Sequence, residues 1–382
     1  MRILHLISDH QVIERTLGVY ESVFPGRNEV LVFSPQGKPF TRLKGKYEGQ
    51  IVDGNNLSSF ARGYDYSNIT HIIAHYMSMD KIDFIKFVPD HIHVCWEIYG
   101  YDLYNQFLFP LGLNIFSEKT YKYTKYPLLS HYFKPLLNFI LMIKGVKYCF
   151  RWQIKKQFKF ITGRVDSLQY CCKYDAKFVE DFAGRTIPSY EVFNYSLKEV
   201  LGDLEGSVFF DGKDILIGNS ASLSNNHLYI LDCLRKVNIS NDSKLIIPLS
   251  YGGTKQYADT VANEYKKVYS DQLEVLREYM PLHEYNNIFL RLRAIILSAW
   301  RQESQGTAIM AFYLGIKVFM SERSPLYKWF VDCGFIVFTI ESLDNNSFEQ
   351  MLSDEEKMHN RQIVVNRYNE SRIAQTLKDN IA

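Results

Sequence analysis

Several short signatures that identify nucleotide-binding and metal-binding proteins are missing from this sequence. No GxGxxG run follows the first apolar segment, where the turn reads Ser8-Asp9-His10-Gln11, so a dinucleotide-dependent oxidoreductase is not expected. A P-loop is absent, Asp-x-Asp occurs nowhere, and no His/Cys cluster has the spacing of zinc ligands. We therefore expect neither a bound metal nor a cofactor.

Long apolar runs and paired cysteines are missing as well. No segment reaches the roughly 18 apolar residues that a membrane-spanning helix needs. The N-terminal run MRILHLIS stops at Ser8-Asp9, which is too early for the core of a signal peptide. The six cysteines show no CxxC pair. These absences predict a cytoplasmic protein with reduced thiols, neither membrane-spanning nor exported by the general secretory route.

What the sequence does contain is a regular alternation of short apolar runs and helix-length segments. Its 382 residues, 47% of them hydrophobic and 23% charged, are sufficient for two globular domains. Strands alternating with helices predict an α/β fold with parallel sheets. We expect a Rossmann-like domain at 1–200, a second at 201–355 and a C-terminal helix at 356–382. The predicted strands are RILHLIS, NEVLVFS, HIIAH, HIHVCWEIY and DSLQYCC in the first half, and ILIGNS, SKLIIPLS, QLEVLRE, RAIILSAW, IKVFM and FIVFTI in the second.

One predicted strand ends abruptly in a small polar turn, within ILIGNSASLSNNH at Ile215 to His227. The turn is either an ordinary βα connection, with Ser224 or Asn225 capping the next helix, or a cradle for a phosphate group. In the second case, free backbone N–H groups and hydroxyls at a helix N-terminus would bind the anion. Taken alone, this stretch leaves both readings open.

The segment from Lys119 to Arg164 contains nine Lys and two Arg but no Asp or Glu, with aromatic residues interleaved. Cationic, aromatic and apolar residues together are typical of a surface that lies at the headgroups of an anionic membrane. Single-stranded nucleic acid and the solvated face of core helices are the alternatives. Because no RNA-binding fingerprint appears elsewhere, we expect a membrane surface and no nucleic acid. The expected contact residues are Lys144, Lys147, Trp152, Lys155 and Lys156.

The chain contains an ordered set of short motifs: Ser8-Asp9, Arg15-Thr16, G-x-D-L-Y at 100–104, G-N-S at 218–220, S-N-x-H at 224–227, P-x-x-Y at 248–251, and Q-G-T at 305–307 with G-I eight residues on. In this order they resemble the bacterial 4-acetamido-4,6-dideoxygalactose (Fuc4NAc) transferases of glycosyltransferase family 56. That family transfers Fuc4NAc from its dTDP form to an undecaprenyl-diphosphate-linked saccharide of enterobacterial common antigen. The resemblance implies a GT-B architecture, in which two Rossmann-like domains face each other across a cleft and the C-terminal domain binds the donor.

The resemblance implies that two polar loops, at 218–220 and at 305–307, bind the diphosphate of the donor. Gly218 would let the diphosphate approach the backbone, Ser220 would donate a hydrogen bond, and the following helix would direct its positive end at the charge. Gln305-Gly306-Thr307 would form the second site, with a plain helix N-cap as the alternative. Glu303 is present there, but Met310 occupies the place of a second Glu that many GT-B enzymes use for the ribose. The expected donor-binding residues are Gly218, Asn219, Ser220, Asn225, His227, Tyr251, Gln305, Gly306 and Thr307, with Arg15 as a further substrate contact.

Three acidic residues of the first half are candidates for the base that accepts the proton of the acceptor hydroxyl. Asp9 and Asp102 each follow a predicted strand, where the ligand side of an α/β sheet lies. Glu97 lies inside a strand, where it could instead face the core with a partner. Each aspartate also has a structural alternative, Asp9 as a helix cap and Asp102 as a turn residue.

The function expected from these observations is transfer of a Fuc4NAc-like acetamido-dideoxyhexose or a related sugar. The donor would be a dTDP- or UDP-sugar and the acceptor an undecaprenyl-diphosphate-linked saccharide in surface polysaccharide synthesis. The enzyme would be metal-independent, cytoplasmic and peripheral on the inner face of the cell membrane. The alternative is a non-catalytic nucleotide- or glycan-binding protein with the same fold.

Overall fold

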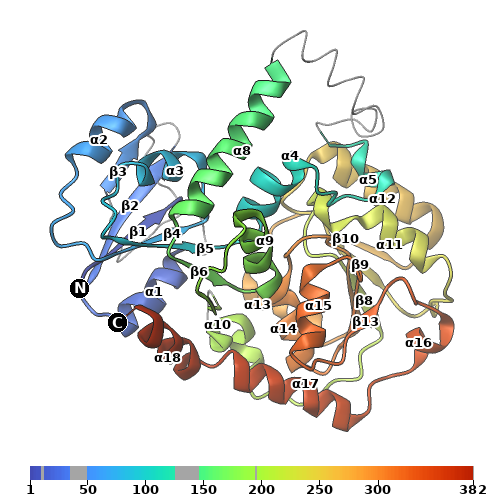
Figure 1. Ribbon diagram of the computed structural model, residues 1–382. Coiled ribbons are helices and arrows are strands. Elements are labelled where there is room, and N and C mark those ends of the chain that lie inside the picture. Colours follow the sequence, from blue (N-terminus) through green and yellow to red (C-terminus); the bar gives the residue numbers. More distant parts are fainter. Residues whose placement is uncertain (10–12, 35–49, 125–145, 194–195, 382) are drawn as a thin grey trace. The chain divides into compact units, whose positions relative to one another are not determined.

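The computed structural model describes residues 1–9, 13–34, 50–124, 146–193 and 196–381 of the chain (Figure 1). They form two compact units, each built on a parallel sheet. Unit 1 comprises the described residues of Met1–Leu113, Val146–Ser196 and Tyr368–Ala382, and unit 2 those of Asn114–Gly145 and Leu197–Arg367. The predicted division differs in two places, because the last helix belongs to unit 1 and residues 114–124 to unit 2.

Unit 1 contains a seven-stranded sheet in the order β3-β2-β1-β4-β5-β6-β7, with every neighbouring pair parallel. The run ILHLI of β1 is buried at every position, as expected for a central strand covered on both faces. The strands are β1 (Ile3–Ile7), β2 (Asn28–Ser34), β3 (Gln50–Asp53), β4 (His71–His75), β5 (His93–Glu97), β6 (Ser167–Tyr170) and β7 (Ser189–Glu191).

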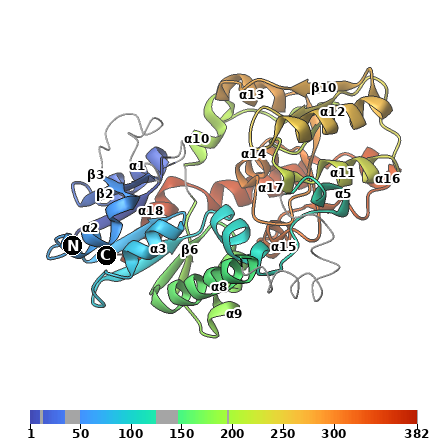
Figure 2. The ribbon, with the colours of Figure 1, turned by 90° about the horizontal axis from the view of Figure 1, so that it is seen from above.

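The last helix of the chain, α18, packs against α1 and β7, so both ends of the chain lie in unit 1 (Figures 1 and 2). Glycine in the left-handed conformation ends two helices of this unit, Gly112 after α4 and Gly184 after α9. The helices of unit 1 are α1 (Ile13–Val23), η1 (Gly54–Asn56), α2 (Leu57–Gly63), α3 (Met79–Ile85), the π-helical η2 (Asp102–Leu108), α4 (Phe109–Leu111), α8 (Val146–Arg164), α9 (Lys173–Ala183) and α18 (Glu370–Ile381).

Unit 2 contains a six-stranded sheet in the order β10-β9-β8-β11-β12-β13, again with every neighbouring pair parallel. The four residues of β8 are all buried, and so are those of β9 and β12. The strands are β8 (Asp214–Ile217), β9 (Leu245–Pro248), β10 (Leu273–Leu276), β11 (Leu292–Leu297), β12 (Lys317–Met320) and β13 (Phe338–Thr339).

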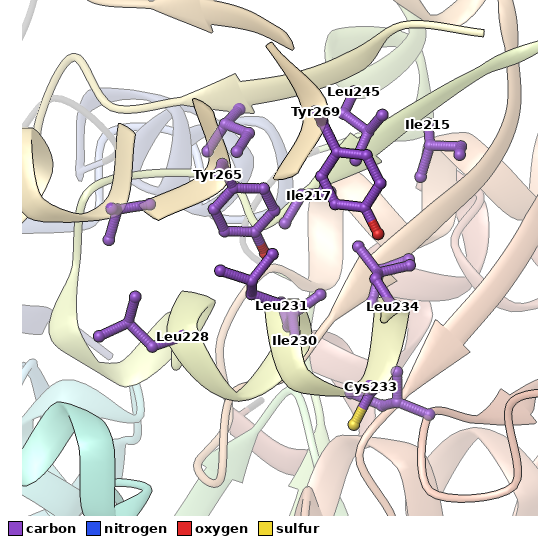
Figure 3. Close-up of a cluster of buried hydrophobic side chains, with 14 of the residues drawn as sticks. Ile215, Ile217, Leu228, Ile230, Leu231, Cys233, Leu234, Leu245, Tyr265 and Tyr269 are labelled. Carbon is purple, nitrogen blue, oxygen red and sulfur yellow. The ribbon is translucent and has the colours of Figure 1, made fainter. Parts of the chain in front are cut away.

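Apolar side chains of α11 and α12 pack against each other and against β8 and β9 in one core cluster (Figure 3). Leu231 and Leu234 of α11 lie beside Tyr265 and Tyr269 of α12 in this view. This packing fixes the position at which α11 begins. The helices of unit 2 are α5 (Glu118–Tyr121), α10 (Leu197–Leu201), η3 (Gly202–Leu204), η4 (Leu223–Asn225), α11 (His227–Leu234), α12 (Lys255–Tyr269), α13 (Leu282–Phe289), α14 (Gln305–Tyr313), α15 (Pro325–Asp332), α16 (Asn345–Glu349) and α17 (Asp354–Arg367).

Both sheets have the strand order of a Rossmann fold, in which the chain changes direction beside the first strand. The change lies between β1 and β4 in unit 1 and between β8 and β11 in unit 2. Ligands of such sheets bind outside the carboxyl ends of the strands at this point. The loops after β1, β4, β8 and β11 are therefore where a site is expected.

The predicted α/β class and all eleven predicted strands are confirmed, whereas β3 and β7 were not predicted. In the part of the chain that the structure describes, no helix is both long and apolar enough to cross a membrane.

Candidate active site

The loop between β8 and α11 requires glycine at 218. Gly218 has a φ of +68°, and a Cβ atom there would lie 2.8 Å from His227 Nε2 and 3.2 Å from Asn225 Oδ1. Its N–H donates to the Ile296 carbonyl of β11 at 2.9 Å. The backbone of this turn is thus fixed at the edge of the sheet, between the two strands where the chain changes direction.

Other residues of the same loop hold the hydroxyl group of Ser220 in place. Asn225 Nδ2 donates to Ser220 Oγ at 3.1 Å and to the Ser220 carbonyl at 3.3 Å, and Ser222 N donates to Ser220 Oγ at 3.3 Å. Because the hydroxyl oxygen of Ser220 accepts both of its bonds, its own hydrogen remains available as a donor. This arrangement suits the role predicted for Ser220.

Three buried polar atoms near Gly218 have no hydrogen-bond partner among the described residues: Asn219 Oδ1, Asn225 Oδ1 and His227 Nε2. Burial lowers the pKa of His227 to about 3, so its imidazole is neutral. Its Nδ1 lies 3.5 Å from the Tyr257 hydroxyl. A buried polar group without a partner costs about 1–3 kcal/mol. Such groups call for a partner, and a ligand, an ion or a water bound at this loop would supply one.

The second predicted loop, between β11 and α14, is joined to the first. Ser224 donates to the Glu303 carboxylate, which also pairs with Arg301 at 3.0 Å. The side chains of Arg301 and Glu303 are only 8% and 12% exposed, so this ion pair is largely shielded from solvent. Ser304, with a φ of +68°, then leads into α14. Gln305 is buried, and Gly306 and Thr307 are half-buried at the start of that helix.

The loop between β9 and α12 completes this edge of unit 2. Ala221 N donates to the Tyr251 carbonyl at 2.7 Å, and a Cβ atom on Gly253 would lie 2.0 Å from the Ala221 carbonyl oxygen. Tyr251 is half exposed. Partial burial and, after it, the nearby charge of Glu303 raise the pKa of Tyr251. The structure therefore places all nine predicted donor-binding residues on three loops at the carboxyl edge of one sheet.

Asn226 is a residue of this site that the sequence analysis did not select. It has a φ of +50° and is fully buried. Its side chain accepts from Ser117 N at 2.8 Å and donates to the Ser298 carbonyl at 3.1 Å. It thus ties residues 114–124 to the loops after β8 and β11. The only sequence signal was its place as the variable position of the S-N-x-H motif.

Asp102 is fully buried, and neither of its oxygens is accessible to a substrate in this structure. Its Oδ2 accepts from Met77 N at 2.9 Å and from Trp96 Nε1 at 2.8 Å, while Oδ1 accepts from Tyr99 N at 3.0 Å. Burial raises the pKa of Asp102, and these hydrogen bonds oppose the shift. The contacts favour the structural alternative for Asp102, since they join the loops after β4 and β5.

Glu97 faces the core of unit 1, where its Oε2 contacts His75 Nδ1. His75 Nε2 lies 2.8 Å from His5 Nδ1, and His5 Nε2 lies 3.0 Å from Asn28 Oδ1. Burial lowers the pKa of both histidines, to about 3 for His5, and raises the pKa of Glu97 to about 8. Hydrogen bonds therefore join the neutral side chains of Asn28, His5 and His75 across β2, β1 and β4, and Glu97 of β5 contacts the His75 end of this chain.

Lys81 of α3 is a second buried group that the sequence did not reveal. Its Nζ donates to the His75 carbonyl at 2.5 Å and to the Tyr76 carbonyl at 2.9 Å. Burial lowers the pKa of Lys81 to about 7, although Asp102 and other carboxylates act in the opposite direction. The lysine thus fixes the turn at the carboxyl end of β4, next to β1.

The remaining candidates of unit 1 lie nearer the surface. Asp9 is half-buried just beyond β1, and Arg15 of α1 is exposed. On α8, Trp152 is 57% exposed, Lys155 and Lys156 are exposed, and Lys156 Nζ lies 5.4 Å from the centre of the Trp152 ring. Lys144 lies outside the described residues, as does the side chain of Lys147. No group of three or more His, Cys, Asp or Glu suited to a metal ion occurs within the described ranges.

Solved structures with the same fold are glycosyltransferases of low sequence identity. HepE from Anabaena in complex with UDP has a TM-score of 0.61 at 10% identity, over 99% of each chain. Sucrose-phosphate synthase from Thermosynechococcus elongatus has a TM-score of 0.60 at 10% identity, over 99% of this chain and 98% of the other. A trehalose-phosphate synthase from Burkholderia vietnamiensis has a TM-score of 0.57 at 8% identity, over 99% of each chain. The likeness confirms the GT-B architecture of two parallel-sheet α/β units.

A search of curated protein sequences finds no match. A family model, however, matches residues 164–375, which is more than half of the chain and includes the three loops of unit 2. With its GT-B fold and this match, the chain belongs to the 4-alpha-L-fucosyltransferase family, glycosyl transferase group 56.

Proposed function

We propose that this glycosyltransferase uses a dTDP- or UDP-sugar, with an acetamido-dideoxyhexose such as Fuc4NAc or a related sugar as the transferred group. The acceptor in this proposal is an undecaprenyl-diphosphate-linked saccharide of surface polysaccharide synthesis. The observation that carries the donor side is the group of unpartnered buried atoms around Gly218, joined through Ser224 and Glu303 to the N-terminus of α14. HepE, which shares the fold, was solved with UDP and with UDP-glucose.

In this proposal the diphosphate binds at the loops after β8 and β11. Ser220 donates its free hydrogen, and the first N–H groups of α14 at Gln305, Gly306 and Thr307 supply further donors and the positive end of a helix dipole. The neutral His227 donates from Nε2, which has no other hydrogen-bond partner among the described residues. Tyr251, half exposed beside Glu303, is placed to contact the nucleoside or the sugar. Unit 1 contributes the acceptor side, with Asp9 as base and Arg15 as a further contact.

A membrane surface is the second part of the proposal, because the acceptor's lipid cannot leave the bilayer without a large cost in free energy. The exposed Trp152, Lys155 and Lys156 support it, since an amphipathic aromatic ring flanked by cations suits an anionic headgroup layer.

Transfer should proceed without divalent metal. Incubation of the protein with dTDP- or UDP-activated acetamido-dideoxyhexose and a polyprenyl-diphosphate saccharide should yield an elongated lipid-linked product, detected by mass spectrometry. EDTA should leave both donor affinity and turnover nearly unchanged, because backbone N–H groups and hydroxyls neutralise the leaving diphosphate. A tenfold loss on chelation would contradict metal independence. Donor binding without any transfer would favour the non-catalytic alternative.

Replacing Gly218 with alanine should lower affinity for dTDP or UDP at least tenfold, measured by titration calorimetry. The added Cβ would meet His227 Nε2 and Asn225 Oδ1, so the loop must shift. Gly206→Ala is a matched control in the same unit, since Gly206 has a φ of +78° but nothing within 4 Å of the added atom. Both variants should lose about 1–2 kcal/mol of stability from the left-handed backbone, and only Gly218→Ala should lose nucleotide. Equal nucleotide affinity of Gly218→Ala and Gly206→Ala would show that the loop at Gly218 is not part of the donor site.

A further inference from the structure

An open groove of about 790 Å³ lies in unit 1 between η2, α4, α8 and α9, within the size range of ligand sites. Helix α8 lies beside α4 and α9 along this groove (Figure 1). Six of its lining residues are large apolar side chains, and none of the six is fully buried. They are Leu108, Leu111, Leu113, Trp152, Phe178 and Phe182. A concave site lined mainly by apolar side chains with a few polar groups is the usual form of a ligand pocket.

The groove rests on a rigid aromatic layer. The rings of Phe182 and Phe158 stack at 4.1 Å between centroids, and those of Phe158 and Phe107 stack at 4.6 Å. Phe107 and Phe158 are fully buried, and their rings contact Trp96 of β5 edge-on. The floor is therefore formed before any ligand binds, which lowers the entropic cost of binding an apolar chain.

The two polar side chains of the groove are both cationic, and no Asp or Glu is among its lining residues. Arg151 Nη2 donates to the Leu111 carbonyl at 2.6 Å, which holds the guanidinium over the groove. Lys155 follows one helical turn later on the same side of α8 and is exposed. Among the described residues, neither Arg151 nor Lys155 has an acidic side chain within ion-pair distance.

A second groove, of about 500 Å³, lies on the other side of Trp152 and differs in chemistry. Gln153 and Gln157 are among its lining residues, and its Lys86 pairs with Asp83 at 2.5 Å. Gln157 also donates to Asp83 at 3.1 Å. A ligand with an apolar chain and an anionic head would find fewer apolar side chains here, and one of the two cations, Lys86, is already paired, so the first groove fits such a ligand better.

We propose that the groove between α4, α8 and α9 binds the first isoprenoid units of the lipid-linked acceptor, with the phosphate groups at Arg151 and Lys155. The proposal rests on the proposed function, because it assigns a place to the acceptor's lipid. A hydrocarbon chain covers the six apolar side chains, and the phosphates use both cations, which a neutral apolar peptide would leave unpaired. In the groove the chain exchanges one apolar environment for another, and the groove's own apolar side chains are removed from water, at about 25 cal/mol per Å².

Farnesyl phosphate, below its aggregation concentration and without vesicles or sugar nucleotide, tests the proposal directly. It should shift the fluorescence of Trp152 and bind at least tenfold more tightly than farnesol, and inorganic phosphate at the same concentration should give no shift. Trp152→Phe identifies the signal, because the chain has four tryptophans. Calorimetry gives the affinities of variants independently of fluorescence.

Leu108→Glu and Lys155→Glu should each weaken farnesyl phosphate binding at least tenfold. Lys156→Glu is the matched control. This substitution changes the charge by the same amount one residue away, and Lys156 lines the second groove rather than the first. Thermal unfolding checks that Leu108→Glu is folded, and the exposed Lys155 provides a variant with little effect on folding. Absence of binding, or equal weakening by Lys155→Glu and Lys156→Glu, would overturn the proposal. The assay contains no sugar donor, so an absence of farnesyl phosphate binding would not contradict the proposed transfer reaction. An absence of transfer would likewise not contradict binding of farnesyl phosphate.

Discussion

Replacement of Asp9 with asparagine is expected to lower turnover by about 10² or more, the range for loss of a positioned general base. Asparagine keeps the shape of the side chain but cannot accept a proton from the acceptor hydroxyl. Asp9 lies just beyond β1, half-buried, at the point where the strand order of unit 1 changes direction. Affinity for dTDP or UDP should be retained, because the proposed donor loops belong to unit 2.

Asp102→Asn is the matched control for this experiment. The Asp102 carboxylate accepts three hydrogen bonds from Met77, Trp96 and Tyr99, and an amide nitrogen in place of one oxygen would face a donor. The free energy of unfolding should fall by about 1–3 kcal/mol, visible in thermal unfolding. The same measurement on Asp9→Asn separates a loss of turnover from a loss of stability. Near-normal turnover of Asp9→Asn would mean that the base is another group or that the reaction does not use one.

The strands of both sheets could be predicted because apolar runs of four to seven residues, separated by helical segments, are a property of local sequence. The two strands that were not predicted, β3 and β7, are the edge strands of the sheet in unit 1. Edge strands are buried less, so they lack a continuous apolar run. β7 has only three residues, Ser189–Glu191, and one of them is exposed.

The site could be predicted in part, and the reason lies in sequence separation. Gly218, Asn219 and Ser220 are adjacent in the chain and follow an apolar run directly, so the sequence alone predicted a turn after a strand. The bond between Ser224 and Glu303 joins residues 79 positions apart, and His5 and His75, which are 70 apart, look like polar interruptions of two strands. Their burial depends on partners that only the sheet register brings together. Glu97, by contrast, was expected to face the core with a partner as one alternative, and its contact with His75 agrees with that alternative.

The hydrogen-bonded chain through His75 assigns a proton to Glu97. Asn28 Nδ2 donates to Glu21 Oε2 and to the Phe24 carbonyl, each at 2.8 Å, so its Oδ1 accepts from His5 Nε2. A neutral imidazole carries one N–H, and His5 Nδ1 therefore accepts from His75 Nε2. His75 Nδ1 is then an acceptor, and the group that faces it is Glu97. A contact between this acceptor nitrogen and Glu97 is favourable only with a protonated carboxyl, in agreement with the raised pKa of Glu97, about 8.

Glu97→Gln should consequently stabilise unit 1 relative to the wild type as the pH rises. Native Glu97 retains its proton up to a pKa of about 8, whereas the carboxyl of the unfolded chain loses it near 4.5. Between these values the native state binds more protons than the unfolded state, so this group lowers the free energy of unfolding by about 1.4 kcal/mol per pH unit. The side-chain amide introduced by Glu97→Gln would donate to His75 Nδ1 at every pH. Contributions of titrating groups that do not interact with Glu97 are common to both proteins and cancel in the difference. Lys81 is the exception, since its pKa of about 7 is raised in part by Glu97.

Hydrogen exchange at the amides of β4, corrected for intrinsic rates, measures this difference within unit 1. The opening free energy of Glu97→Gln minus that of the wild type should be small at pH 5 and should increase steadily to pH 8. Glu97→Ala is the control, since it also lacks the titrating group but leaves His75 Nδ1 without a donor. The opening free energy of Glu97→Ala minus that of the wild type should rise with pH in parallel with the difference for Glu97→Gln, and should lie about 1–3 kcal/mol lower at each pH. A difference between Glu97→Gln and wild type that stays constant from pH 5 to pH 8 would show that Glu97 is ionised in the native core, with His75 as the donor.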